Sequence, residues 1–226
     1  MARIVSVAAA AARITDGMTV MIGGFMGCGN AHTMIQAVID AGVRDLTLVC
    51  NDAAMPDFGV GKLIRHKRVR RLVATHVGLN PEVAQQMHSG ELEVELVPQG
   101  SFVEKIRAGG AGLGGVLTPT GIGTVVAEGK QVIEVRGKPY LLEEPLRADV
   151  SLINGYRIDT NGNVWYKGTT RNFNVVMATA ADLVIAEADH VVGIGDIGPE
   201  NVMTPGIFVD LVVDGKEQPT GQGKEH

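Results

Sequence analysis

Residues 19–29 read Thr19-Val20-Met21-Ile22-Gly23-Gly24-Phe25-Met26-Gly27-Cys28-Gly29. The first four are apolar or β-branched, which is typical of a short buried strand. The next seven contain four glycines and are predicted to form a loop. A helix over 33–41 is indicated by Met34, Ile35, Val38 and Ile39 on one face and by Gly42 as its stop. This stretch therefore predicts a strand, a glycine loop and a helix in direct succession.

The same alternation continues through the first half of the chain. Apolar runs at 46–50 and 72–75 predict two more buried strands, and residues 92–97 alternate apolar and acidic side chains as an exposed edge strand does. Asn80-Pro81-Glu82 indicates a helix start, and Gly90 a helix end. Alternating strands and helices predict a mostly parallel sheet covered by helices, in an α/β fold.

A further helix is predicted after the edge strand. Ser101 and Glu104 have the spacing of a capping box, and Gly109 is the expected stop. Glu104 is accordingly interpreted as the capping partner of Ser101 rather than as a catalytic acid.

The pattern changes after residue 109. Residues 109–124 form a glycine-rich excursion, and 131–135 with 140–142 predict a β-hairpin around the turn Arg136-Gly137-Lys138. Buried strands are predicted again at 149–153 and 182–186. Because we find neither an internal repeat nor a linker, we predict a single domain over 1–216 and a polar tail over 217–226.

Composition and charge argue against several classes of function. The 226 residues carry a net charge of −5, and the basic run at 62–71 has no interleaved aromatic residue for stacking on bases. No apolar run approaches the roughly 20 residues that a membrane-spanning helix needs. The N-terminal stretch is better explained as a helix capped by Ser6 than as a signal peptide. We expect a cytoplasmic protein that binds neither nucleic acid nor membrane.

The cysteines and histidines offer no metal-ligand spacing, so no metal site is predicted. Cys28 lies inside the glycine loop, but no feature of the sequence provides it with a base. We therefore expect it to be a small buried residue rather than a nucleophile.

The glycine loop alone leaves several interpretations open. Its backbone amides, helped by the following helix N-terminus, are placed to meet an anion or a pantetheine amide, and glycine would let a ligand approach closely. A tight strand-to-helix turn explains the same residues equally well. Asp52 after the next strand invites a dinucleotide-binding interpretation, but the order G-G-x-x-G-x-G differs from the expected G-x-G-x-x-G.

The residues from Asp16 to Phe25, followed by Gly27 and Gly29, resemble the first signature of the family I 3-oxoacid coenzyme A (CoA) transferases. That signature normally closes Gly-x-Pro, whereas Ala31 stands in place of the proline here. The similarity continues over most of the chain, from about Ile14 to Val213. It is carried by the segments 98–112, 118–124, 128–130, 146–149, 171–174 and 204–206. The chain is most similar to the A subunits of bacterial enzymes that move CoA among acetate, butyrate and acetoacetate.

The resemblance implies a ping-pong transfer of CoA between a short-chain acyl-CoA and a free carboxylic acid. A glutamate attacks the thioester and becomes a glutamyl-CoA thioester, with no cofactor other than the CoA substrate. In the family this glutamate lies in a Glu-Asn-Gly motif on the B subunit. Here only Glu200-Asn201-Val202 is present, and we interpret Glu200 as a surface residue. We therefore expect an A subunit that needs a B subunit, in an α2β2 heterotetramer.

The resemblance also implies site residues. Those expected to bind CoA are Gly23, Gly24, Phe25, Met26, Gly27, Cys28 and Gly29. Asn51 and Gln99 each follow a strand end, and the resemblance places both amides in the substrate pocket. Loop-capping amides that bond their own backbone are the equally weighted alternative. The rival function is a non-catalytic or isomerase-like module that binds a nucleotide or sugar phosphate at the glycine loop.

Overall fold

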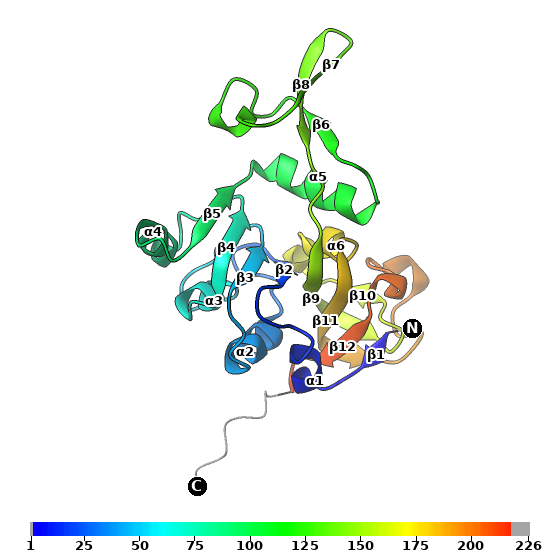
Figure 1. Cartoon of the computed structure of the whole chain (residues 1–226). Helices are drawn as coiled ribbons and strands as arrows, with labels where there is room; N and C mark the ends of the chain where they lie inside the picture. The colour runs from blue at the N-terminus through cyan, green and yellow to red at the C-terminus, as the bar shows by residue number, and fades with distance from the viewer. Residues whose placement is uncertain (1, 218–226) are drawn as a thin grey trace.

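The computed structural model describes residues 2–217 and contains a nine-stranded sheet (Figure 1). Its strands are β1 (Arg3–Ile4), β2 (Thr19–Ile22), β3 (Leu46–Val49), β4 (Val69–Ala74), β5 (Glu93–Leu96), β9 (Ala148–Asp159), β10 (Val164–Trp165), β11 (Ala181–Val192) and β12 (Leu211–Asp214). They lie in the order β1-β12-β11-β9-β2-β3-β4-β5, with β10 added to β9. All neighbouring pairs are parallel except the β9–β10 pair. The predicted α/β fold with a mostly parallel sheet is therefore confirmed.

Helices cover both faces of the sheet. They are α1 (Val7–Ala11), α2 (His32–Asp40), α3 (Gly61–Arg65), α4 (Pro81–His88), α5 (Gln99–Gly110) and α6 (Asn174–Met177). Short 3-10 turns are η1 (Val125–Ala127), η2 (Gly168–Arg171), η3 (Pro199–Asn201) and η4 (Gly206–Phe208). The core packed by α1–α4 and the core packed by α5 and α6 form separate clusters of buried side chains.

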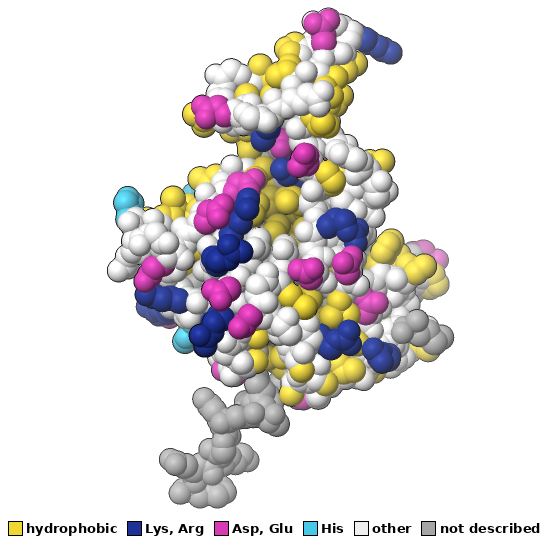
Figure 2. Space-filling model, in the orientation of Figure 1, with side chains coloured by type: hydrophobic (Ala, Val, Ile, Leu, Met, Phe, Trp, Pro, Cys, Tyr) yellow, Lys and Arg dark blue, Asp and Glu magenta, His cyan; other side chains and the backbone are white. Residues whose placement is uncertain are grey.

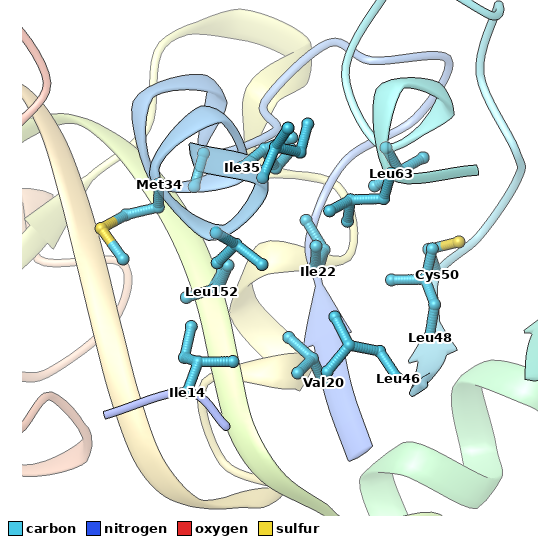
Figure 3. Packing of buried hydrophobic residues seen from close by; sticks show 14 of the residues in the cluster. Ile14, Val20, Ile22, Met34, Ile35, Leu46, Leu48, Cys50, Leu63 and Leu152 are labelled. Carbon is cyan, nitrogen blue, oxygen red and sulfur yellow. The ribbon is translucent and has the colours of Figure 1, made fainter. Parts of the chain in front are cut away.

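Side chains alternate between these two cores along β2, β3 and β4, as the pleat requires. In β2, Val20 and Ile22 join the α1–α4 core, whereas Met21 joins the α5–α6 core. Figure 3 shows Ile22 and Leu152 below Met34 and Ile35 of α2, with Val20 beside Leu46 in the same core. Because both faces are buried, the strands appear in the sequence as continuous apolar runs rather than as alternating patterns.

Two predicted caps are confirmed and one is wrong. Ser6 caps α1, and Asn80 caps α4 with Pro81 at its first position. The capping box at Ser101 and Glu104 does not form, because the N-cap of α5 is Pro98, three residues before Ser101. The amide of Phe102 closes the first turn onto the carbonyl of Pro98, at 2.8 Å, so Ser101 already lies inside the helix. Glu104 pairs with Arg107 at the surface instead.

The glycine-rich excursion and the hairpin form a second, three-stranded antiparallel sheet that projects from the body, at the top of Figure 1. It contains β6 (Val116–Thr118), β7 (Val132–Val135) and β8 (Lys138–Glu143). Arg136 and Gly137, both with positive φ, form the two-residue turn between β7 and β8, as expected of a tight hairpin.

An ion-pair cluster joins this projecting sheet to α5. Glu143 is 1% exposed, and its carboxylate accepts hydrogen bonds from Lys105 of α5 at 3.3 Å and from Lys130 of the excursion at 2.7 Å. A buried carboxylate requires such partners, because an unpaired buried charge is strongly unfavourable.

The basic run at 62–71 is divided between α3, the following turn and β4, and three of its basic side chains pair with acids. Arg65 pairs with Asp57 and Glu82, Lys67 with Glu91, and Arg71 with Glu93 and Glu95. In Figure 2 basic and acidic side chains alternate over the visible face. Within residues 2–217 no helix is both long and apolar enough to cross a membrane.

The predicted polar tail lies outside the described residues except for Glu217. The carboxylate of Glu217 accepts a hydrogen bond from the amide of Val7, at 3.3 Å.

Candidate functional site

The glycine loop closes into a tight turn at the carboxyl end of β2. Phe25 and Cys28 exchange two backbone hydrogen bonds, of 3.0 and 2.9 Å. Met26 and Gly27 between them both have positive φ. Phe25 and Met26 are nearly half exposed, at 46% and 43%. The turn therefore presents two large apolar side chains to the outside.

The loop glycines are explained by packing within the chain. A Cβ on Gly23 would overlap the side chain of Asn174, and one on Gly24 would overlap Asn30. A Cβ on Gly27 would overlap the ring of Phe58, and one on Gly29 would come within 2.9 Å of the carbonyl oxygen of Thr170. The space that we expected a ligand to use is occupied by the protein itself. A CoA-binding role of residues 23–29 stays a prediction.

Three buried polar side chains hold the loop from beneath. Asn30 donates to the carbonyl of Gly23 at 2.6 Å, and Asn174 donates to that of Gly29 at 2.9 Å. Asp52 accepts from the amide of Met26 at 2.8 Å. All three are no more than 6% exposed. The loop is thus fixed from α6, from the end of β3 and from its own C-terminal end.

The helix that follows the loop does not offer its N-terminus to a ligand. Glu187 of β11 accepts hydrogen bonds from the amides of Thr33 and Met34, the first turn of α2, at 3.1 and 2.8 Å. Burial raises the pKa of Glu187 to about 7, against the opposing effect of these amide hydrogen bonds. Our expectation that this N-terminus assists anion binding by the loop is therefore not supported, because a side chain already fills the position.

Asn51 and Gln99 meet each other. The Nε2 of Gln99 donates to the Oδ1 of Asn51 at 2.7 Å, although β3 and β5 are separated by β4 in the sheet. Asn51 is buried at 2% exposure, whereas Gln99 is exposed. The two amides therefore form one unit in which Gln99 is the member that can reach a ligand.

Gln99 and Phe25 border the same pocket. Its volume is about 370 Å³, and its lining is Phe25, Gln99, Gly100, Val103, Asn172 and Phe173. The pocket lies between the glycine loop, the first turn of α5 and the segment joining η2 to α6. The N-terminal turn of α5 has no side-chain cap, so the positive end of its dipole is available on this side.

A basic groove adjoins this pocket. It has about 360 Å³, shares Val103 and Asn172 with the pocket, and is lined on its far side by Arg107 and Arg171. An apolar pocket beside two guanidinium groups suits a ligand that has both an apolar part and an anionic part.

A family model described as coenzyme A transferase matches residues 4–215. The chain belongs to this family of enzymes. It is 52% identical over 202 residues to the acetate CoA-transferase subunit alpha of Escherichia coli K12, with 89% of this chain and 92% of that protein covered. It is 49% identical over 198 residues to the acetoacetyl-CoA:acetate/butyrate CoA transferase alpha subunit of Clostridium acetobutylicum, covering 88% and 91%.

Solved structures show the same fold. The acyl-CoA transferase YdiF of E. coli O157:H7, crystallised as a thioester complex with CoA, superposes with a TM-score of 0.83 at 22% identity. The match covers 94% of this chain and 47% of that one, so this CoA transferase chain spans about half the length of YdiF.

Cys28 corrects one sequence-based expectation for this CoA transferase chain. It is exposed rather than buried, and its sulfur lies 3.4 Å from the Oγ1 of Thr169 in η2. Cys28 closes the tight turn through its backbone, and its side chain lies beside η2.

Sequence reasoning missed the roles of Asn172, Phe173, Asn174 and Asp52. The segment 171–174 was identified as a family motif, but no local pattern indicates that it lines a pocket with Phe25 and with the first turn of α5, which are distant in the sequence. Two asparagines in four residues were the available signal, since buried amides usually hold backbone groups.

No carboxylate borders the pocket of Phe25 and Gln99. Glu200 lies in η3, is exposed as predicted, and does not border this pocket. Within the described residues no cluster of histidine, cysteine and acidic side chains could hold a metal ion.

Proposed function

We propose that this chain is the alpha subunit of a heteromeric CoA transferase that moves CoA between a short-chain acyl-CoA and a free carboxylic acid. Acetate, butyrate and acetoacetate are the candidate acids, as in the names of the related alpha subunits. The observation that carries the proposal is a pocket with apolar walls and an oriented amide but no carboxylate of its own. The complex is proposed to be an α2β2 heterotetramer in the cytoplasm that needs no cofactor beyond CoA.

The pocket suits the two parts of an acyl thioester. Phe25, Val103 and Phe173 provide apolar surface for a short acyl chain or for pantetheine. The Gln99 amide and the first turn of α5 provide donors for a carbonyl or carboxylate oxygen. Arg107 and Arg171 in the adjoining groove suit the phosphates of CoA.

The proposed reaction requires a nucleophile from a partner subunit. A partner glutamate attacks the thioester carbonyl, forms an acyl anhydride and releases CoA thiolate. The thiolate then attacks the glutamyl carbonyl of the anhydride, which yields a glutamyl-CoA thioester and the free carboxylate. A second acid reverses these steps. In each step negative charge develops on a carbonyl oxygen, where a donor such as the Gln99 amide stabilises it.

The rival function, a module that binds a nucleotide or sugar phosphate at the glycine loop, finds less support. Such a module would use the N-terminus of α2 for phosphate. Glu187 occupies that position and would repel a phosphate.

Reconstitution tests the proposed function. The purified chain is expected to show no transfer between butyryl-CoA and acetate, and addition of its beta subunit is expected to restore it. In the complex, Gln99→Ala should lower kcat/KM by about 10²-fold, the typical effect of removing an oxyanion donor. Gln85→Ala on the exposed face of α4 is the matched control and should leave kcat/KM unchanged. Transfer by the isolated chain would contradict the assignment, as would inactivity of the complex with all three acids.

A further inference from the structure

We propose that Asp52 is a positioning residue that fixes the amide of Gln99 through Asn51 and the tip of the glycine loop through Met26. The inference rests on the proposed function, because it concerns the same pocket. Asp52 does not border the pocket itself. Its effect is transmitted by residues that border the pocket or lie next to those that do.

Asp52 is a buried carboxylate whose oxygens are engaged by N–H groups. It is 6% exposed. Its Oδ2 accepts from the amide of Met26 and from the Nδ2 of Asn51, both at 2.8 Å, and its Oδ1 accepts from the amide of Ala54 at 2.9 Å. Within residues 2–217 no Lys, Arg or His forms an ion pair with it. Three N–H donors therefore compensate for burial of the charge.

A carboxylate can only accept hydrogen bonds, and this property determines the direction of the neighbouring amides. Asn51 has to present its Nδ2 to Asp52, which leaves its Oδ1 on the opposite side. That oxygen accepts from the Nε2 of Gln99 at 2.7 Å and from the Oγ1 of Thr75 at 3.2 Å. Gln99 in turn has to present its Nε2 to Asn51. Asp52 thus sets the orientation of the exposed Gln99 amide through two successive hydrogen bonds.

Without the carboxylate, each amide could turn over. An asparagine or glutamine amide presents either its oxygen or its nitrogen with little change of shape, so only the surrounding hydrogen bonds select one orientation. A reversed Gln99 would exchange the positions of its donor and acceptor. Its Oε1 would then face the Oδ1 of Asn51, and its N–H groups would leave the position that the hydrogen bond to Asn51 now fixes.

The second role of Asp52 concerns backbone conformation. Met26 and Ala54 both have positive φ, 51° and 47°, which is unfavourable for residues other than glycine. Asp52 accepts hydrogen bonds from the backbone amides of both residues. One carboxylate therefore holds two strained positions, and one of them carries the exposed Met26 next to Phe25.

The test uses the complex of this chain with its beta subunit and a matched control. Asp159, at the turn after β9, is also a buried carboxylate, at 2% exposure. Its carboxylate also accepts three hydrogen bonds, from the backbone amides of Asn161 and Asn163 and from the Nδ2 of Asn163, at 2.9–3.0 Å. Asp52→Asn and Asp159→Asn make the same chemical change, and only the first lies beneath the pocket.

We expect Asp52→Asn to lower kcat about 30-fold while the KM for acyl-CoA changes less than about threefold, because orientation of a transition-state donor is lost. Asp159→Asn should change kcat by less than about twofold at a temperature where both variants are folded. In the Gln99→Ala background, Asp52→Asn should lower kcat only about threefold further, since the group that it orients is gone. The remaining threefold loss of kcat represents the weakened hydrogen bond between Asp52 and the amide of Met26.

Equal kcat values for the two aspartate variants would overturn the inference, and so would the same 30-fold loss with and without Gln99. If Asp52→Asn does not fold, Asn51→Ala replaces it in the test. This substitution removes the side chain that links Asp52 to Gln99 and keeps the hydrogen bonds of Asp52 to the amides of Met26 and Ala54. Its loss of kcat must likewise shrink in the Gln99→Ala background. Failure of the proposed function would appear differently, as an unsubstituted complex without transferase activity.

Discussion

Replacing Gly23 by alanine is expected to lower the free energy of unfolding by about 3 kcal/mol, because the new methyl group has no space and its neighbour cannot yield. An ideal Cβ overlaps the side chain of Asn174 and lies 3.0 Å from its Cα. Asn174 is fully buried and donates to the carbonyls of Gly29 and Thr170, at 2.9 and 2.8 Å. Moving it aside breaks these bonds. Urea denaturation of the purified chain measures the change.

Gly114→Ala is the matched control for this substitution. No atom lies within 4 Å of an ideal Cβ on Gly114, and its φ is not positive, so the change should be within about 0.5 kcal/mol. If the clash with Asn174 is the cause, Gly23→Ala and Asn174→Ala together should be less destabilising than their sum, by about 1–3 kcal/mol. Additive effects would contradict the packing explanation of the loop glycine.

Replacing Glu143 by glutamine is expected to destabilise the attachment of the projecting sheet by about 3 kcal/mol, because two lysines then face a neutral amide in a buried position. Glu143 is 1% exposed, and the side chain of Lys105 is 11% exposed. Because this cluster joins β8 to α5, the loss should be largest within residues 116–143. Hydrogen exchange of the β7 and β8 amides should accelerate more than that of β2 and β3.

Two comparisons separate the buried charge from a general effect of removing an acid. Glu104→Gln breaks the exposed pair with Arg107 and should change stability by less than about 0.5 kcal/mol. Lys105→Met combined with Glu143→Leu replaces the buried pair by apolar side chains and should recover much of the loss, since Lys130 can turn toward solvent. An unaltered exchange rate in β7 and β8 of Glu143→Gln would be incompatible with this role.

The sequence allowed prediction of those elements that local patterns determine. The apolar run at 19–22, the Asn80-Pro81 start of α4 and the Arg136-Gly137 turn each act within a few residues, and the structure confirms all three. The parallel order of the central strands followed from the alternation of strands and helices. The start of α5 was mispredicted, because the proline at its cap was a stronger signal than the capping box.

The candidate site was harder to predict, because its contacts join distant parts of the chain. The N-terminus of α2 is filled by Glu187 from β11, and Gly23 and Gly29 of the loop pack against Asn174 of α6, some 150 residues away in both cases. No pattern within the loop distinguishes a glycine that accommodates a ligand from one that accommodates another side chain. The structure brings Asn51 and Gln99 into contact, as expected of side chains that follow strand ends at the same edge of a parallel sheet, whereas their role in a substrate pocket stays a prediction. The contacts of Asp52 became visible only in the structure.

The central claim is that this chain shapes the pocket while a partner subunit provides the attacking carboxylate. Incubation of the complex with butyryl-CoA in the absence of an acceptor acid, followed by proteolysis and mass spectrometry, locates the CoA thioester. The account predicts the adduct on a glutamate of the beta subunit and none on this chain. A CoA adduct on any aspartate or glutamate of this chain would contradict it.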